Sequence, residues 1–339
     1  MLNLLRMKNE SVDRVQSEGK RMIWSFLSRR EFIVGASATT GLLAASGECK
    51  PQGEIDPNRV LIASDIHIPL PWSEQKYRTG REYPWIVDTV KNHIAEILAL
   101  DPLPANFIAL GDMSIAFGEE KEYAILRELL QPLYDRGIKV TLAMGNHDIR
   151  ASYAKSFPEA AAQSLVSGRY VHKVETPYAD FLILDSLKEP TVRGSYPAVT
   201  GVGLGEVQRD WLLKALPTLA KPTFVCAHHQ IHEIGVKKAI IRAQKVVGYL
   251  HGHNHAWIQQ SVFHGYADDS RSLQSVGIGS FAIDRDIGYA IMDLKEVGAC
   301  LRMVAKDYYF PAKLPRERRP KVWDAIVRDH QGRKVHFPF

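Results

Sequence analysis

Short apolar runs alternate with amphipathic segments along most of this chain. Residues 59–64 form an apolar run that ends in a polar residue, which predicts a buried strand leading into a loop. Within residues 82–100, Ile86, Val90 and Ile94 recur at helical spacing. The patterned part of the chain therefore begins with a strand, a loop and a helix.

The same alternation continues to about residue 310. The predicted elements are strands at 107–110, 139–144 and 223–227, two strands within 170–184, and helices at 119–136 and 206–216. In the last of these helices, Val207, Trp211 and Leu212 share one face. Segments 239–250, 276–282 and 288–293 extend the pattern, and no Pro/Gly/Ser-rich linker interrupts it. We therefore predict a layered α/β fold with one domain over residues 56–310.

The composition is that of an ordinary folded protein. The chain has 339 residues, 45% of them apolar and 24% charged, which is close to the average for soluble globular domains. Its net charge is +5, and the residues from Lys313 onward carry an excess equal to all of it. No nucleic-acid motif accompanies this charge, so we expect a solvated basic tail over residues 311–339 and no specific nucleic-acid partner.

The three cysteines, Cys49, Cys226 and Cys300, show no paired spacing such as C-x-x-C. Neither a disulfide framework nor a cysteine metal site is expected. Cys226 and Cys300 stand in apolar, strand-like surroundings, which predicts buried thiols.

We predict that residues 1–49 are an N-terminal extension and export signal, because they resemble a twin-arginine signal. Arg29 and Arg30 precede an uncharged apolar stretch of small residues at 34–45, which is shorter than the roughly 20 residues that span a bilayer. The resemblance implies export, to the periplasm, without a transmembrane segment; an ordinary buried helix is the alternative. Glu48 precedes Cys49 where lipid attachment needs a small residue, so no lipid anchor is expected.

Polar clusters follow the predicted strands. They are Asp65-x-His67, Gly111-Asp112, Gly145-Asn146-His147-Asp148, His228-His229 and Gly252-His253-Asn254-His255. Loops at the carboxyl ends of strands in open α/β sheets converge on one crevice. Carboxylate, amide and imidazole donors suit divalent Mn, Fe, Zn or Co. Together the clusters can supply two metal sites.

The spacing within the clusters has a geometric reason. Residues i and i+2 of an extended segment point to the same side, so Asp65 and His67 can share a cavity. The glycines at 111, 145 and 252 permit tight turns and a close approach of the backbone to a ligand. A single cluster of this kind is weak evidence, because an isolated histidine is more often an ordinary polar residue.

Five clusters in this order resemble the calcineurin-like metallophosphoesterase superfamily, and more closely its phosphodiesterase-like branch. The resemblance covers residues 65–255 directly. It implies an α/β fold, a four-layer α-β-β-α sandwich with two mixed β-sheets and a dimetal site at one end. It also implies the ligands: Asp65, His67 and His255 for one metal, Asn146, His228 and His253 for the other, with Asp112 bridging both.

The resemblance implies a metal-dependent hydrolase. Two cations a few ångströms apart lower the pKa of a shared water, so that a metal-bridging hydroxide attacks a phosphodiester or monoester. His147 would act beside them, by stabilising the phosphoryl group or protonating the leaving oxygen. The substrate would be a small phosphate ester; its identity and the oligomeric state stay open. A non-catalytic metal-binding scaffold on the same fold is the alternative.

The sequence departs from the family pattern after Asp112. Many relatives carry G-D-x-x-D, whose last carboxylate orients the catalytic histidine, whereas Ile115 stands here. Another acid or a backbone carbonyl would have to hold His147. His229 and His251 are expected to line the site and orient the ligands. For Arg150, contact with a substrate phosphate and an exposed loop position are both open.

Overall fold

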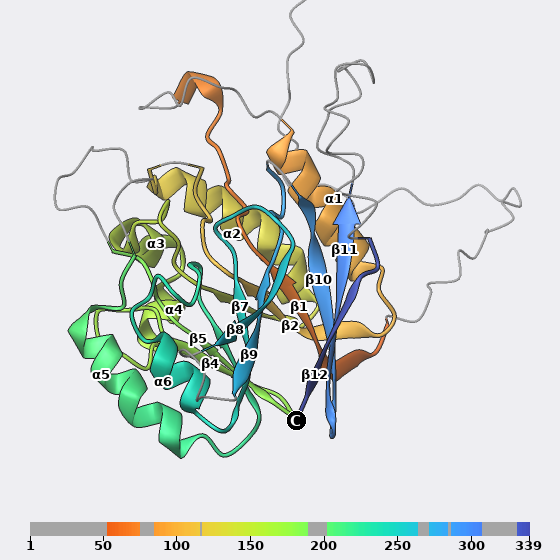
Figure 1. Ribbon diagram of the computed structural model, residues 1–339. Coiled ribbons are helices and arrows are strands. Elements are labelled where there is room, and N and C mark those ends of the chain that lie inside the picture. The colour runs from red at the N-terminus through yellow and green to blue at the C-terminus, as the bar shows by residue number, and fades with distance from the viewer. Residues whose placement is uncertain are drawn as a thin grey trace, which may run out of the picture. The chain divides into compact units, whose positions relative to one another are not determined.

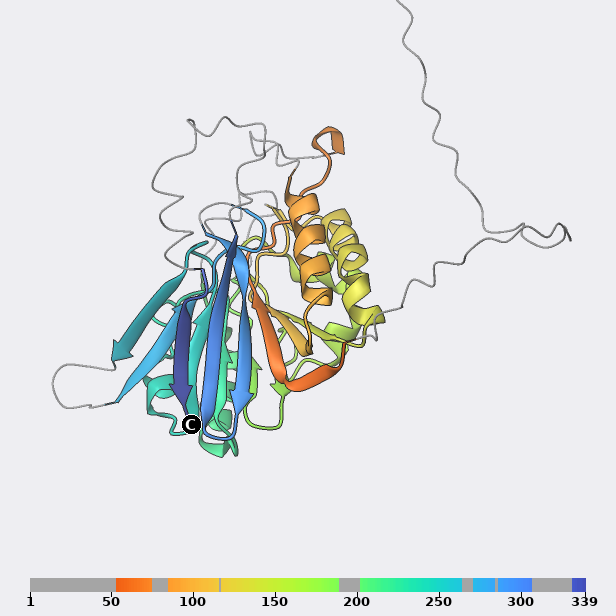
Figure 2. The same ribbon diagram turned by 90° about the vertical axis from the view of Figure 1, so that its right-hand side faces the viewer.

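The computed structural model describes residues 53–74, 85–115, 117–188, 202–263, 271–283, 286–306 and 331–339. The predicted export signal, Cys49 and residues 311–330 of the predicted basic tail lie outside these ranges. Within them, none of the helices has the length and apolar character needed to cross a membrane. The described residues form two β-sheets with helices on their outer faces (Figures 1 and 2).

The first sheet has six strands in the order β12-β11-β10-β1-β2-β3. Its members are β1 (Ile55–Ala63), β2 (Leu103–Ala109), β3 (Lys139–Leu142), β10 (Ile287–Lys295), β11 (Gly298–Lys306) and β12 (Lys334–Pro338). Strands β1, β2 and β3 are parallel, whereas β10, β11 and β12 continue the sheet in antiparallel pairs. The sheet is therefore mixed.

The second sheet also has six strands, in the order β4-β5-β6-β7-β9-β8. They are β4 (His172–Glu175), β5 (Asp180–Ile183), β6 (Thr223–Cys226), β7 (Val246–His251), β8 (Ile258–Phe263) and β9 (Ser272–Gly277). The four central strands are parallel, and β4 and β8 pair antiparallel at the edges. This sheet is mixed as well.

Three apolar cores separate four layers. Residues such as Ile62 of β1 and Phe181 of β5 lie between the two sheets. On the other face of the first sheet, Leu61 packs beneath helices α1 (Ile86–Leu98) and α2 (Glu120–Asp135). The outer face of the second sheet packs against α5 (Gly205–Ala215) and α6 (Lys237–Arg242). Strands buried on both faces explain the continuous apolar runs, and the predicted four-layer sandwich is confirmed.

Short helical segments complete the described chain. They are η1 (Trp72–Glu74), α3 (Arg150–Ser156), α4 (Pro158–Ala162) and η3 (Leu216–Thr218). Of the two described cysteines, Cys226 is buried and Cys300 is partly exposed, and both are free thiols.

Helix α5 differs from its prediction in the face that it buries. Val207 is 67% exposed, while Leu212 and the polar Gln208 are buried. The Gln208 side chain accepts a hydrogen bond from the backbone N–H of Asp185 and donates one to its carbonyl, at 2.9 and 2.7 Å. These two bonds satisfy the backbone just beyond β5, which is why a polar residue lies beneath the helix.

Part of the predicted basic tail is a strand of the first sheet. Strand β12 pairs antiparallel with β11, and Val335 and Phe337 pack between the sheets. Alternation of polar and apolar residues over 334–337 is the signal for such a strand, and the surrounding basic residues obscured it. The sheet thus extends beyond residue 310.

The predicted polar clusters follow five strands whose carboxyl ends meet. Strands β1, β2 and β3 are parallel neighbours in one sheet, and β6 and β7 are parallel neighbours in the other. Each is followed within a few residues by one cluster. The loops of both sheets are therefore available to build one site.

Candidate metal centre

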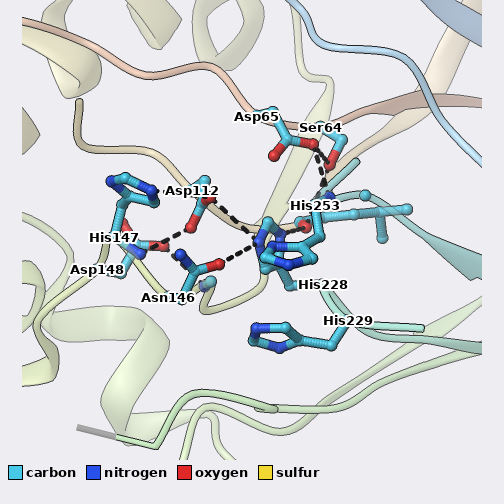
Figure 3. A network of polar contacts seen from close by, with 12 residues as sticks. Ser64, Asp65, Asp112, Asn146, His147, Asp148, His228, His229 and His253 are labelled. Atoms are coloured by element: carbon cyan, nitrogen blue, oxygen red, sulfur yellow. Dashed lines mark hydrogen bonds and ion pairs between the residues drawn. The ribbon is translucent and has the colours of Figure 1, made fainter. Parts of the chain in front are cut away.

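The structure brings together all seven predicted ligand side chains. The ligand atoms of Asp65, His67, Asp112 and His255 lie within 4.8 Å of one another, and those of His228, His229 and His253 form a second such group. Asn146 adjoins the second group, with its Oδ1 3.0 Å from His228 Nε2. Figure 3 shows Asp112 lying between Asp65, His147 and the histidines of the second group.

Asp112 is the residue that links the two groups. Its Oδ2 lies 3.1 Å from Nε2 of His228 and 3.7 Å from Nε2 of His67. Its Oδ1 accepts a hydrogen bond from the backbone N–H of His147, at 2.8 Å. One carboxylate oxygen is thus held by the backbone while the other faces donors of both groups, which is the arrangement a bridging ligand requires.

Five of the ligand residues have a left-handed backbone. They are Asp65, His67, Asp112, His253 and His255, with φ between 50° and 70°. This conformation is uncommon outside glycine and clusters at functional sites, where the surrounding structure holds the strain. In the D-x-H and H-x-H clusters the first and third residues both have this left-handed conformation. The backbone there bends more tightly than the extended geometry expected from the spacing.

The direction of the loops depends on close packing at two glycines. Gly111 has a φ of 94°, and a Cβ there would lie 2.6 Å from Nδ1 of His228. A Cβ on Gly252 would overlap Oγ of Ser64 and lie 2.6 Å from Oδ2 of Asp65. These glycines therefore admit ligand side chains, a role beyond the turns and backbone approach expected from the sequence.

Asp65 has one oxygen engaged by the protein and one directed into the site. Oδ2 accepts hydrogen bonds from Ser64 Oγ and the His253 backbone N–H, at 2.6 and 3.1 Å. Oδ1 is buried, accepts no hydrogen bond from the described residues, and lies 3.2 Å from His255 Nε2. A buried, unsatisfied carboxylate oxygen is costly unless a cation binds there, so this oxygen fits a metal ligand.

The imidazoles are oriented by carbonyl groups. His67 Nδ1 lies 3.0 Å from the carbonyl oxygen of Ser114, and His228 Nδ1 lies 2.8 Å from that of Leu110. Because a carbonyl only accepts, Nδ1 of each ring carries a proton, and Nε2 is the atom that can bind a metal when the ring is neutral. Nε2 atoms of His67 and His255 face each other at 3.0 Å, a contact that a shared cation would relieve.

The electrostatics of the site centre on Asp112 and His228. Burial raises the pKa of Asp112, but His228 and His147 lower it by more, to well below its usual value. Burial lowers the pKa of His228, but Asp112 raises it by more, to about 9. Burial lowers the pKa of His67 to about 3, so this imidazole is neutral and able to bind a metal.

His147 lies beside Asp112 at the rim of the site. Its Nε2 is 4.0 Å from Asp112 Oδ2, its side chain is 15% exposed, and its ring meets that of His67 edge-on at 5.0 Å between centroids. Like His255, whose side chain is 17% exposed, it is reachable by a substrate. Ile115 packs in the core beneath α1 and α2, so its position supplies nothing to orient His147.

Asp148 is a buried acid that the sequence left without a role. It accepts hydrogen bonds from the backbone N–H groups of Met113 and Gly145, at 3.1 and 2.8 Å, and from the hydroxyl of Tyr123 at 3.1 Å. It therefore joins the loop that carries Asp112 to the loop that carries Asn146. Ser64 and Tyr123 act in the same supporting way, and no feature of the sequence distinguished them from other polar residues.

Arg150 takes neither of the positions considered from the sequence. Its guanidinium donates two hydrogen bonds to the buried Asp185, at 2.7 and 2.8 Å, and one to the carbonyl of Leu187 at 2.6 Å. Such a bidentate pair is strong and directional. Arg150 thus anchors the start of α3 to the end of β5.

His229 and His251 both lie buried beside the ligands. His229 Nδ1 is 2.8 Å from Ser186 Oγ, and His251 Nδ1 is 3.0 Å from the carbonyl of Gly252. Burial lowers the pKa of His229 to about 2 and that of His251 to about 4. Only His229 belongs to a group of potential metal ligands among the described residues.

Comparison with known proteins agrees with this geometry. The family model for calcineurin-like phosphoesterases matches residues 58–257, more than half of the chain, so the chain belongs to this family. No curated protein matches the chain significantly in sequence. Membership in the family and the clustered donors point to divalent metal ions as cofactors, and the clustered residues fit them.

Among solved structures, a dimetal phosphatase from Danio rerio matches with 15% identity, covering 73% of this chain and 96% of its own, with a TM-score of 0.53. This likeness supports the shared fold. A predicted phosphoesterase from Streptococcus pneumoniae matches at 11% identity, 83% and 98% coverage and a TM-score of 0.34. Vps29 from Entamoeba histolytica, solved with Zn²⁺, matches at 11% identity, 73% and 92% coverage and a TM-score of 0.32.

Proposed function

We propose that this chain is a two-metal phosphohydrolase that cleaves a phosphodiester, or secondarily a monoester, of a small molecule. The observation that carries the proposal is the position of Asp112, whose Oδ2 faces the donor groups of both sheets at 3.1 and 3.7 Å. Family membership supports phosphoester hydrolysis in general. Asp65, His67 and His255 would hold one metal and Asn146, His228 and His253 the other.

The bound metals would neutralise phosphate charge and lower the pKa of a water molecule between them. The protein's own part is orientation. Ser64 and the carbonyls of Ser114 and Leu110 fix the Asp65, His67 and His228 donors before substrate arrives. Such fixed donors avoid reorganisation during the reaction.

His147 would donate a proton to the leaving oxygen or a hydrogen bond to the phosphoryl group. Its exposure at the rim and its distance of 4.0 Å from Asp112 Oδ2 support this role. A positioned acid of this kind contributes about 10²–10⁴-fold to the rate. Because Ile115 supplies no carboxylate, a diester with an acidic leaving group should be cleaved more readily than one with a poor leaving group.

The test is hydrolysis of bis(p-nitrophenyl) phosphate and p-nitrophenyl phosphate with Mn²⁺. We expect cleavage of the diester, abolished in Asn146→Ala and reduced about 10²-fold or more in His147→Ala. His232→Ala, a substitution of an exposed histidine, is the matched control and should behave as wild type. Metal binding without hydrolysis of either ester would favour the scaffold alternative.

We also propose that the chain is exported in folded form by a twin-arginine signal. The support is Arg29 and Arg30 followed by the uncharged stretch at 34–45. Cell fractionation tests it: we expect a shortened chain in the periplasm, abolished by replacing both arginines with lysine. An unprocessed chain found only in the cytosol would contradict the proposal.

A further inference from the structure

His229 occupies a place that its expected lining role does not explain. Its ring centroid lies 4.8 Å from those of both His228 and His253, and its side chain is buried, with 1% of the residue exposed. Its ligand atom lies within 4.8 Å of those of both neighbours. Figure 3 shows its ring below the side chains of His228 and His253.

The chain conformation explains how two consecutive histidines reach one site. Consecutive side chains of a strand point to opposite faces, but β6 ends at Cys226 and the chain bends at His228 and His229. The carbonyl of His229 accepts a hydrogen bond from the Tyr249 hydroxyl at 2.7 Å. The bend is therefore held by β7, and it turns the second imidazole back toward the first.

The ring of His229 is held by a hydroxyl group, whereas the rings of His67 and His228 are held by carbonyl oxygens. Its Nδ1 lies 2.8 Å from Ser186 Oγ. Because a hydroxyl can accept as well as donate, Ser186 can accept the Nδ1 proton, and Nε2 then carries the lone pair. A metal-ligating imidazole usually has one ring nitrogen held by an oxygen in this way, so that the other can bind the ion.

We propose that His229 is a ligand of the second metal ion, together with His228 and His253. The proposal rests on the two-metal site of the proposed function. It changes the chemistry of that site. The second metal would have three imidazoles, the Asn146 amide oxygen and the shared Asp112, whereas the first would have two imidazoles and two carboxylates. The nitrogen-rich site should prefer Zn²⁺ or Co²⁺ more strongly than Mn²⁺, and the two sites should differ in affinity.

The test measures metal binding by the full chain, stripped of metal and then titrated with Zn²⁺ by calorimetry and with Co²⁺ by visible absorption. Wild type should bind two equivalents in two affinity classes. His229→Phe, which keeps a ring but removes the nitrogens, should weaken one equivalent by about tenfold or more and alter the Co²⁺ bands, leaving the other equivalent unchanged. His232→Ala should match wild type.

Two unchanged equivalents with unchanged Co²⁺ bands in His229→Phe would overturn the proposal. If His229→Phe does not fold, Ser186→Ala carries the test, because it keeps the imidazole and removes only its anchor. In Ser186→Ala one Zn²⁺ equivalent should bind more weakly than in wild type, by less than in His229→Phe. An unaltered Zn²⁺ affinity in Ser186→Ala would overturn the role of His229 as a ligand. A wild type that binds two metals but hydrolyses no ester would contradict the proposed function, while selective weakening in His229→Phe would still support His229 as a ligand.

Discussion

At the scale of single residues, the site is built from strained backbone. Five donor residues, among them Asp65 and His255, have left-handed φ values, and the loops around them hold that strain through hydrogen bonds such as those to Asp65 Oδ2. A left-handed conformation costs a non-glycine residue about 1–2 kcal/mol. The metal-free protein should therefore be less stable than its packing alone would allow.

His255 offers a direct measurement of this strain. Its φ is 50°, and both His255→Gly and His255→Ala remove the imidazole. Because glycine adopts positive φ freely, His255→Gly should be more stable than His255→Ala by about 1 kcal/mol, the reverse of the usual order. Urea unfolding with chelator present measures the difference. An alanine variant of equal or greater stability would show that the backbone here is not strained.

The sequence could identify the donor residues but not their supporters. Asp65, His67 and the other donors could be identified because charged and imidazole side chains at strand ends form a recognisable pattern. Ser64 and Ser186 were not, because a serine acquires its role only from a partner distant in the chain or from local geometry. Arg150 was misplaced for the same reason, since its partner Asp185 lies on another strand end.

At the scale of elements, the first turn of α2 fixes the loop that carries Asp112. Glu122 accepts hydrogen bonds from the Ser114 hydroxyl, at 2.5 Å, and from the backbone N–H of Glu119, at 3.0 Å. Burial raises the pKa of Glu122 to about 8, and the nearby Glu119 and Asp148 carboxylates also raise it, despite these two hydrogen bonds. The helix thus begins with a carboxyl group that is more easily protonated in the folded state.

This pKa gives stability a definite pH dependence. Because the folded state holds the Glu122 proton up to about pH 8 and the unfolded state releases it near 4.5, Glu122 makes stability fall as pH rises between these values. The slope is at most about 1.4 kcal/mol per pH unit. Glu122→Gln keeps the hydrogen-bonding shape without titrating, so its urea-unfolding free energy should fall less between pH 5 and 8. Parallel pH profiles for the two proteins would contradict this.

Elements were predictable where burial imposes a period. The central strands are buried on both faces and read as continuous apolar runs, and the helices α1 and α2 are buried on one face and show apolar residues at helical spacing. The edge strands β8 and β12 were harder to predict from the sequence. Residues 258–263 alternate between half-buried and exposed positions, and β12 lies within a basic segment. Their place depends on pairing with β9 and β11, which is a tertiary effect that local patterns do not encode.

At the scale of the described domain, the site connects the two sheets. Loops after β1, β2 and β3 supply Asp65, Asp112 and Asn146, while loops after β6 and β7 supply His228 and His253. The prediction of a dimetal site at one end of the sandwich followed from the family resemblance, because the apolar pattern of the sequence does not reveal which strands are neighbours. Bound metal would therefore join the sheets at one end.

Metal binding should stabilise the folded chain. At a free Mn²⁺ concentration 100 times the dissociation constant, a single site that exists only in the folded state adds roughly 2.7 kcal/mol. The thermal midpoint should rise with Mn²⁺ and fall with chelator, and Asn146→Ala should show a smaller rise than wild type. Differential scanning fluorimetry measures these shifts; equal shifts in both proteins would contradict the role of Asn146.

The central claim is that the seven gathered donors hold two cations with Asp112 between them. The most direct measurement is anomalous diffraction from crystals grown with Mn²⁺. The account predicts two peaks in the pocket, roughly 3.5–4 Å apart, with the Asp112 carboxylate in contact with both. A single peak, or two peaks of which Asp112 contacts only one, would contradict it.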